Sequence, residues 1–117
     1  MNLSEEELKN KVKKGNKKMK DLKGKYCVIR GDRSGVFAGI VQEQEGREVE
    51  LTDCRRLWYW EGACSISEIA TDGVTEPNEC KFTVTVDEIK LLDVIEMIPC
   101  TEKAEKCIRG VKEWKKN

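Results

Sequence analysis

Two arginines and three aromatic rings follow one another in the hexapeptide 55–60, which reads Arg-Arg-Leu-Trp-Tyr-Trp. Only 6% of the chain is aromatic, so this concentration is unusual for its composition. Guanidinium groups bind phosphate through paired hydrogen bonds, and aromatic faces stack on nucleobases. The hexapeptide is therefore the first place to look for a nucleotide-binding surface.

The residues alone leave three interpretations of the hexapeptide open. Side chains alternate between the two faces of a strand, so we expect Arg56, Trp58 and Trp60 to share one face. Arg55 and Tyr59 then lie on the opposite face. One set could fill the core, since large tryptophans are usually mostly buried, or form a subunit interface, or line a ligand platform.

Two neighbouring segments add groups that suit an anion. The glycine-flanked turn at 30–35 holds Arg30, Arg33 and Ser34, and such turns can form nests of backbone N–H groups that bind anions. A polar hairpin turn with an Arg–Asp surface pair is the simpler alternative. Ser65 is the expected N-cap of a short helix, and the first turn of a helix also attracts phosphate.

Overall charge does not favour nucleic acid, because 22 Lys and Arg residues balance 22 Asp and Glu residues. Residues 1–25 nevertheless carry nine lysines against four acidic residues. We interpret 1–23 as a lysine-rich N-terminal helix or arm, which is either a nucleic-acid patch or a solvated face. The chain has no histidine, which excludes Ser-His and Cys-His catalysis, and we do not expect an enzyme.

Six cysteines are present, but none forms a Cys-x-x-Cys pair. We expect reduced and mostly buried thiols, with Cys27 in the core, and neither a metal nor a cofactor. The carboxylates of Asp87, Glu88, Asp93 and Glu96 match no metal-binding loop and are assigned to strand ends. Without an apolar leader or a membrane-spanning run, the sequence predicts an intracellular protein.

The element pattern predicts an α+β fold. We expect a small antiparallel β-sheet or partly open barrel with a short internal helix and flanking N- and C-terminal helices. Residues 24–117 would form a single β-rich domain, and Gly39 marks a bulge or a close approach of two strands. Strands are expected over 26–30, 36–42, 47–51, 55–60, 81–86 and 91–98, and helices over 62–71 and 101–112.

Four segments resemble a widespread family of small bacteriophage proteins of unknown function: 30–39 (RGDRSGVFAG), 55–63 (RRLWYWEGA), 77–84 (PNECKFTV) and 88–102. The resemblance spans about 24–115, and the family is similar to phage sponge proteins that counter the cyclic-oligonucleotide defence called CBASS. It implies a non-catalytic homo-oligomer, dimer or tetramer, that sequesters cyclic dinucleotides such as 3′3′-cGAMP in the cytoplasm of the infected bacterium.

Side-chain chemistry then assigns candidate ligand contacts. Arginines would contact phosphates, aromatic rings would contact bases, and two serines would support them: Arg30, Arg33, Arg55 and Arg56; Trp58, Tyr59 and Trp60; Ser34 and Ser65. Two alternatives remain, namely a small nucleic-acid-binding β-barrel and a non-enzymatic phage interaction protein.

Overall fold

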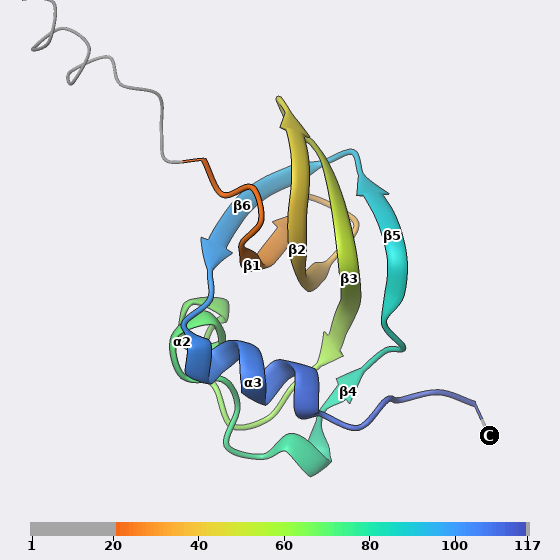
Figure 1. The fold of residues 1–117 in the computed structure, drawn as a ribbon. Coiled ribbons are helices and arrows are strands. Elements are labelled where there is room, and N and C mark those ends of the chain that lie inside the picture. The colour runs from red at the N-terminus through yellow and green to blue at the C-terminus, as the bar shows by residue number, and fades with distance from the viewer. Residues whose placement is uncertain (1–20, 117) are drawn as a thin grey trace, which may run out of the picture.

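The computed structural model describes residues 21–116, so almost all of the lysine-rich arm, including the expected N-terminal helix, lies outside the described residues. Within residues 21–116, six strands and two α-helices give the small α+β fold that the sequence predicted (Figure 1). The elements are β1 (Tyr26–Gly31), β2 (Val36–Glu45), β3 (Glu48–Tyr59), α2 (Ile66–Asp72), the 3₁₀ turn η1 (Pro77–Glu79), β4 (Lys81–Phe82), β5 (Val86–Leu91), β6 (Val94–Pro99) and α3 (Glu102–Gly110).

The six strands form one antiparallel sheet in the order β4-β3-β2-β1-β6, and β5 also pairs with β3. The first part of the long strand β3 pairs with β5, and its last residues pair with β4. Only Leu92 and Asp93 separate β5 from β6, although β5 pairs with β3 and β6 pairs with β1, on the far side of β2. The sheet must therefore curl, as Figure 1 shows, while β5 and β6 form no ladder with each other in the described chain.

Apolar side chains form two core clusters that share β1. Because side chains alternate along a strand, Cys27 and Ile29 join one cluster while Tyr26 and Val28 join the other. The prediction that Cys27 lies in the core is confirmed. The buried residues of the first cluster lie in strands, whereas those of the second include residues of α2 and α3, such as Ile69 and Ile108. The helices therefore cover one face of the sheet, and β1 is buried on both faces.

The strands are joined or divided differently from the prediction at three places, and β2 also runs on to Glu45 rather than ending at residue 42. The expected strands 47–51 and 55–60 are one strand, because β3 continues past Asp53 even though that residue adopts a positive φ of 48°. The expected strand 81–86 divides into β4 and β5 where Thr83 turns to contact β3. The expected strand 91–98 divides at Asp93, whose carboxylate turns towards the 31–35 turn.

Gly39 marks a close approach between β2 and β3, as predicted. The register shifts between Ala38 and Ile40, and a Cβ at Gly39 would lie 2.8 Å from the Cβ of Cys54. Glycine is needed here for lack of space rather than for a special backbone conformation.

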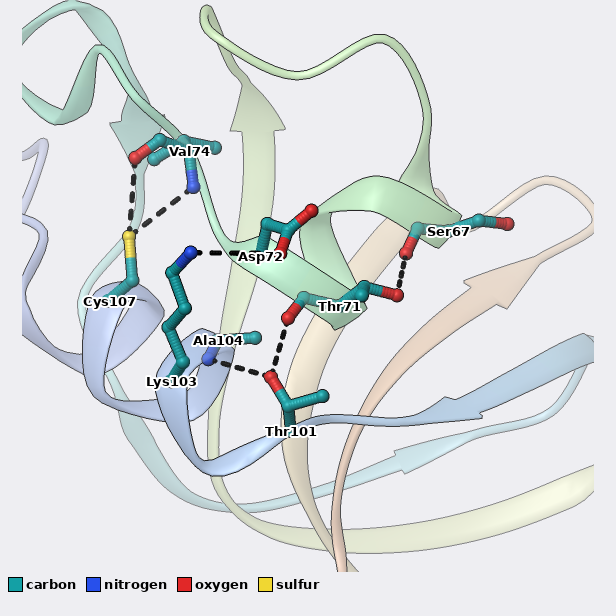
Figure 2. Close-up of polar contacts among 8 residues, drawn as sticks. All are labelled: Ser67, Thr71, Asp72, Val74, Thr101, Lys103, Ala104 and Cys107. Atoms are coloured by element: carbon teal, nitrogen blue, oxygen red, sulfur yellow. Dashed lines mark hydrogen bonds and ion pairs between the residues drawn. The ribbon is translucent and has the colours of Figure 1, made fainter.

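Helix α2 begins after Ser65, the N-cap that the sequence indicated, rather than at residue 62, and α3 begins after Thr101, at the expected start of the C-terminal helix. The hydroxyl of Ser65 accepts a hydrogen bond from the N–H of Glu68, and that of Thr101 accepts one from Ala104. Thr101 has a second role, because its hydroxyl donates to the carbonyl of Thr71 at the end of α2 over 2.6 Å (Figure 2). One side chain thus starts α3 and joins it to α2.

The thiol of Cys107 provides a further link between the helices. Its Sγ accepts from the N–H of Val74 at 3.3 Å and donates to the carbonyl of the same residue at 3.4 Å (Figure 2). A Cβ at Gly73 would lie 2.6 Å from the Cβ of Cys107, so this close contact requires glycine. The ion pair of Lys103 with Asp72 flanks the junction.

Candidate nucleotide-binding surface

Arg55 is a buried residue of the scaffold. Its side chain is only 3% exposed, and its guanidinium donates four hydrogen bonds to backbone carbonyls. Nε donates to Thr83 and Nη2 to Phe82, at 2.9 and 3.1 Å. Nη1 donates to Ile108 and Val111, at 2.9 and 2.8 Å. Arg55 therefore joins β4 and the following residue to the end of α3.

These contacts remove Arg55 from the ligand-binding candidates. A phosphate that bound Arg55 would have to replace the four carbonyls that its guanidinium already contacts. Burial lowers the pKa of the Arg55 guanidinium, yet arginine titrates so far above neutral pH that the group stays charged. A positive charge at the C-terminus of α3 also complements the helix dipole. The role assigned to Arg55 from its residue type is thus corrected.

Arg56 is half-buried and faces a different environment. Its Nη1 donates a short hydrogen bond to the carbonyl of Ser34, and its guanidinium lies 4.4 Å from the ring centre of Phe37. Its backbone N–H donates to the hydroxyl of Thr83. Arg56 therefore connects the 31–35 turn with β3 and is only partly available to a ligand.

The 31–35 turn does bind an anion, but that anion belongs to the protein. The carboxylate of Asp93 accepts the N–H groups of Arg33 and Ser34, at 2.7 and 2.9 Å, and the Ser34 hydroxyl at 2.6 Å. The hydrogen bond from the Ser34 hydroxyl contributes most to lowering the pKa of the Asp93 carboxyl, and the two backbone N–H groups lower it further. An external phosphate would have to compete with this carboxylate. Ser34 is therefore a structural contact, while the exposed side chain of Arg30 lies 3.8 Å from Glu96.

Ser65 is likewise occupied within the fold. Its hydroxyl caps α2, and the carboxylate of Glu68 accepts the N–H of Cys64 at 2.6 Å. The first turn of this short helix thus uses its own side chains to satisfy N–H groups that a phosphate would need. We leave Ser65 out of the proposed contacts.

The aromatic residues of the hexapeptide divide into different environments. Trp58 is 63% exposed and Tyr59 is 43% exposed, whereas Trp60 packs against the core cluster that contains the helices. The sequence placed Trp58 and Trp60 on one face, but β3 ends at Tyr59, so the alternation does not reach Trp60.

Trp58 has a partner that the sequence did not reveal. Its ring stacks on that of Trp114, with centroids 6.2 Å apart and planes inclined by 13°, and Trp114 is itself 46% exposed. The ammonium of Lys81 lies 5.6 Å from the Trp114 ring and 5.8 Å from the Tyr59 ring. We call this exposed group, Trp58, Tyr59, Lys81 and Trp114, the aromatic platform.

The aromatic platform joins the two chemistries that a nucleotide needs. Open indole faces can stack on a base, and an adjacent ammonium can neutralise a phosphate. The sequence offered little indication of Trp114, which stands alone among charged residues. Lys81 is brought to the platform by the pairing of β4 with Tyr59.

Other chemistry is sparse in the part of the chain that the structure describes. No group of three acidic or cysteine side chains there could hold a metal ion. All six cysteines are free, and burial raises the pKa of Cys27 to about 11 and that of Cys54 to about 12. Within residues 21–116, no helix has the length and hydropathy to cross a bilayer.

The fold and surface together define a small α+β protein with a curled antiparallel sheet and an exposed aromatic platform. The chain belongs to a family described as a domain of unknown function (DUF6948), whose model matches residues 24–108. Trp58, Tyr59 and Lys81 lie inside the matched region and Trp114 lies beyond it. No curated protein and no solved structure shows a significant match to the chain.

Proposed function

We propose that this protein binds a cyclic oligonucleotide second messenger, such as 3′3′-cGAMP, without cleaving it. In the cytoplasm of an infected bacterium it would withhold the signal from a CBASS-type defence and so act as a phage immune-evasion protein. The aromatic platform carries the proposal, because stacked and exposed indoles beside a lysine suit a base and its phosphate. The sequence resemblance to phage sponge proteins supplies the biological setting.

The size of the platform limits what one chain can achieve. Stacking is worth on the order of 1–3 kcal/mol per base, and a charge-assisted hydrogen bond about 1.5–3 kcal/mol. Nanomolar binding needs about 12 kcal/mol after the costs of association. One platform therefore falls short, and tight sequestration requires further contacts. A homo-oligomer, dimer or tetramer, would supply them by covering the open side of the ligand.

Calorimetric titration with a panel of cyclic di- and trinucleotides tests this function. We expect at least one ligand to bind, and Trp58→Ala to weaken that binding at least tenfold. Leu92→Ala is the matched control, since Leu92 is also exposed but lies outside the platform. Recovery of intact ligand after heat denaturation would show that the protein does not cleave it. A folded protein that binds no member of the panel would contradict the proposal.

A small nucleic-acid-binding module is the second candidate, because an exposed aromatic platform beside a lysine also suits single-stranded DNA or RNA. This function predicts binding to an oligonucleotide that weakens steeply with salt. It also predicts a strong loss of that binding when the lysine-rich arm, residues 1–23, is deleted. If the platform serves instead as the interface of an interaction protein, Trp58→Ala will change the oligomeric state while no nucleotide binds.

A further inference from the structure

We propose that the ligand site is composite: the C-terminal tail, residues 111–115, completes the aromatic platform, and Arg55 is the positioning residue that holds the tail in place. The inference deepens the proposed function and rests on it, since it concerns how the same nucleotide site is assembled. Its ligand would be a nucleotide whose base stacks on the paired indoles while a phosphate reaches Lys81.

The tail is attached to the body of the protein at few points. Val111, which is buried, follows α3, and its carbonyl accepts from Arg55. Further along, the N–H of Trp114 donates to the carbonyl of Phe82 over 2.8 Å, and Glu113 forms an isolated parallel bridge with Phe82. The stack on Trp58 then fixes the Trp114 ring.

Arg55 acts on both of these attachments. Its Nη1 joins the carbonyls of Ile108 and Val111, which lie where α3 ends and the tail begins. Its Nη2 donates to the same Phe82 carbonyl that receives the N–H of Trp114. The buried guanidinium therefore fixes β4 and the start of the tail relative to each other. This relation places Trp114 beside Trp58.

Lysine cannot reproduce this geometry. A guanidinium presents five N–H groups in a planar fork, whereas an ammonium presents three on one atom. Arg55→Lys keeps the charge but cannot reach carbonyls on both β4 and the tail. We expect the tail to detach more readily, so that Trp114 leaves the stack. Arg55 never touches the ligand in this scheme.

Two readouts test the inference in the full-length protein. Near-ultraviolet circular dichroism reports the stacked indole pair without any ligand, and titration with 3′3′-cGAMP reports the site. Arg55→Lys should diminish the indole signal and weaken binding at least tenfold. A chain ending at Lys112 should do the same, although it retains all four carbonyl partners of Arg55. Arg47→Lys, a conservative change at an exposed arginine that pairs with Asp32 at 3.7 Å, should alter neither readout.

The outcomes separate this inference from the proposed function. A chain ending at Lys112 that binds like the full-length protein would overturn the composite site and leave the function intact. An Arg55→Lys protein with an unchanged indole signal would overturn the positioning role. If the wild type binds no nucleotide, both the proposed function and the composite ligand site are refuted. Loss of the indole signal in Arg55→Lys would still show that Arg55 positions Trp114. If Arg55→Lys does not fold, the shortened chain decides.

Discussion

Replacing Arg55 with leucine should lower the free energy of unfolding by about 3–5 kcal/mol. The change removes four hydrogen bonds from a charged donor to carbonyls of Phe82, Thr83, Ile108 and Val111. Each such bond contributes roughly 1.5–3 kcal/mol when considered alone. The sum overstates the loss, because leucine still fills part of the space and Phe82 keeps its bond from Trp114.

Urea unfolding followed by far-ultraviolet circular dichroism measures this difference. Arg30→Leu is the matched control: its guanidinium is exposed and lies 3.8 Å from the carboxylate of Glu96, so we expect a change below about 1 kcal/mol. The denaturant slope should stay the same in both variants if each unfolds in two states. An Arg55→Leu protein within about 1 kcal/mol of the Arg30→Leu protein would refute the scaffold role assigned to Arg55.

Three other predictions concern the scaffold. Gly39→Ala should destabilise the fold by about 1–3 kcal/mol in a thermal melt, because the added Cβ has no room. Gly110→Ala is the control: this position lies in α3 with open space around it, so the change should stabilise the fold by about 0.5–1 kcal/mol. Equal effects of the two changes would contradict the packing argument. The native pKa of Asp93 lies below its ordinary value, so the stability that its charged carboxylate gives to the fold is fully present above about pH 4. The stability lost in Asp93→Asn should accordingly vanish as the pH falls through that native pKa, and a pH-independent difference would count against this. A thiol reagent should label Cys64 in the folded protein but reach Cys27 only on unfolding, since Cys64 is exposed and Cys27 is buried; rapid labelling of Cys27 would disagree with the structure.

The sequence predicts correctly those features of the fold that depend on residues close together in the chain. The cap at Ser65 and the start of α3 after Thr101 depend on neighbours in the chain, and both were predictable. The small size of Gly39 indicated a close approach, although its partner Cys54 lies on another strand. The strand divisions at Thr83 and Asp93 depend on partners far away in sequence, so periodicity alone could not place them.

The candidate site was predicted less completely for the same reason. Alternation separated Arg55 from Arg56 but could not tell which face is interior. Residue type suggested phosphate contacts at the 31–35 turn, yet the turn receives the carboxylate of Asp93, which comes 59 residues after Ser34. The stack of Trp58 on Trp114 is also a tertiary contact, and it joins the hexapeptide to a tail whose single aromatic residue gives no periodic signal.

The pairing of β1 with β6 has a consequence for how the chain is made. β1 is the first strand that the structure describes, and β6 is the last strand of the sheet. During synthesis, β1 can pair with β2 early, but its other edge stays open until β6 leaves the ribosome. An uncovered strand edge is a template for pairing with other chains, and pairing between distant segments is slow. The nascent protein is therefore most exposed to misassembly just before its sheet is complete.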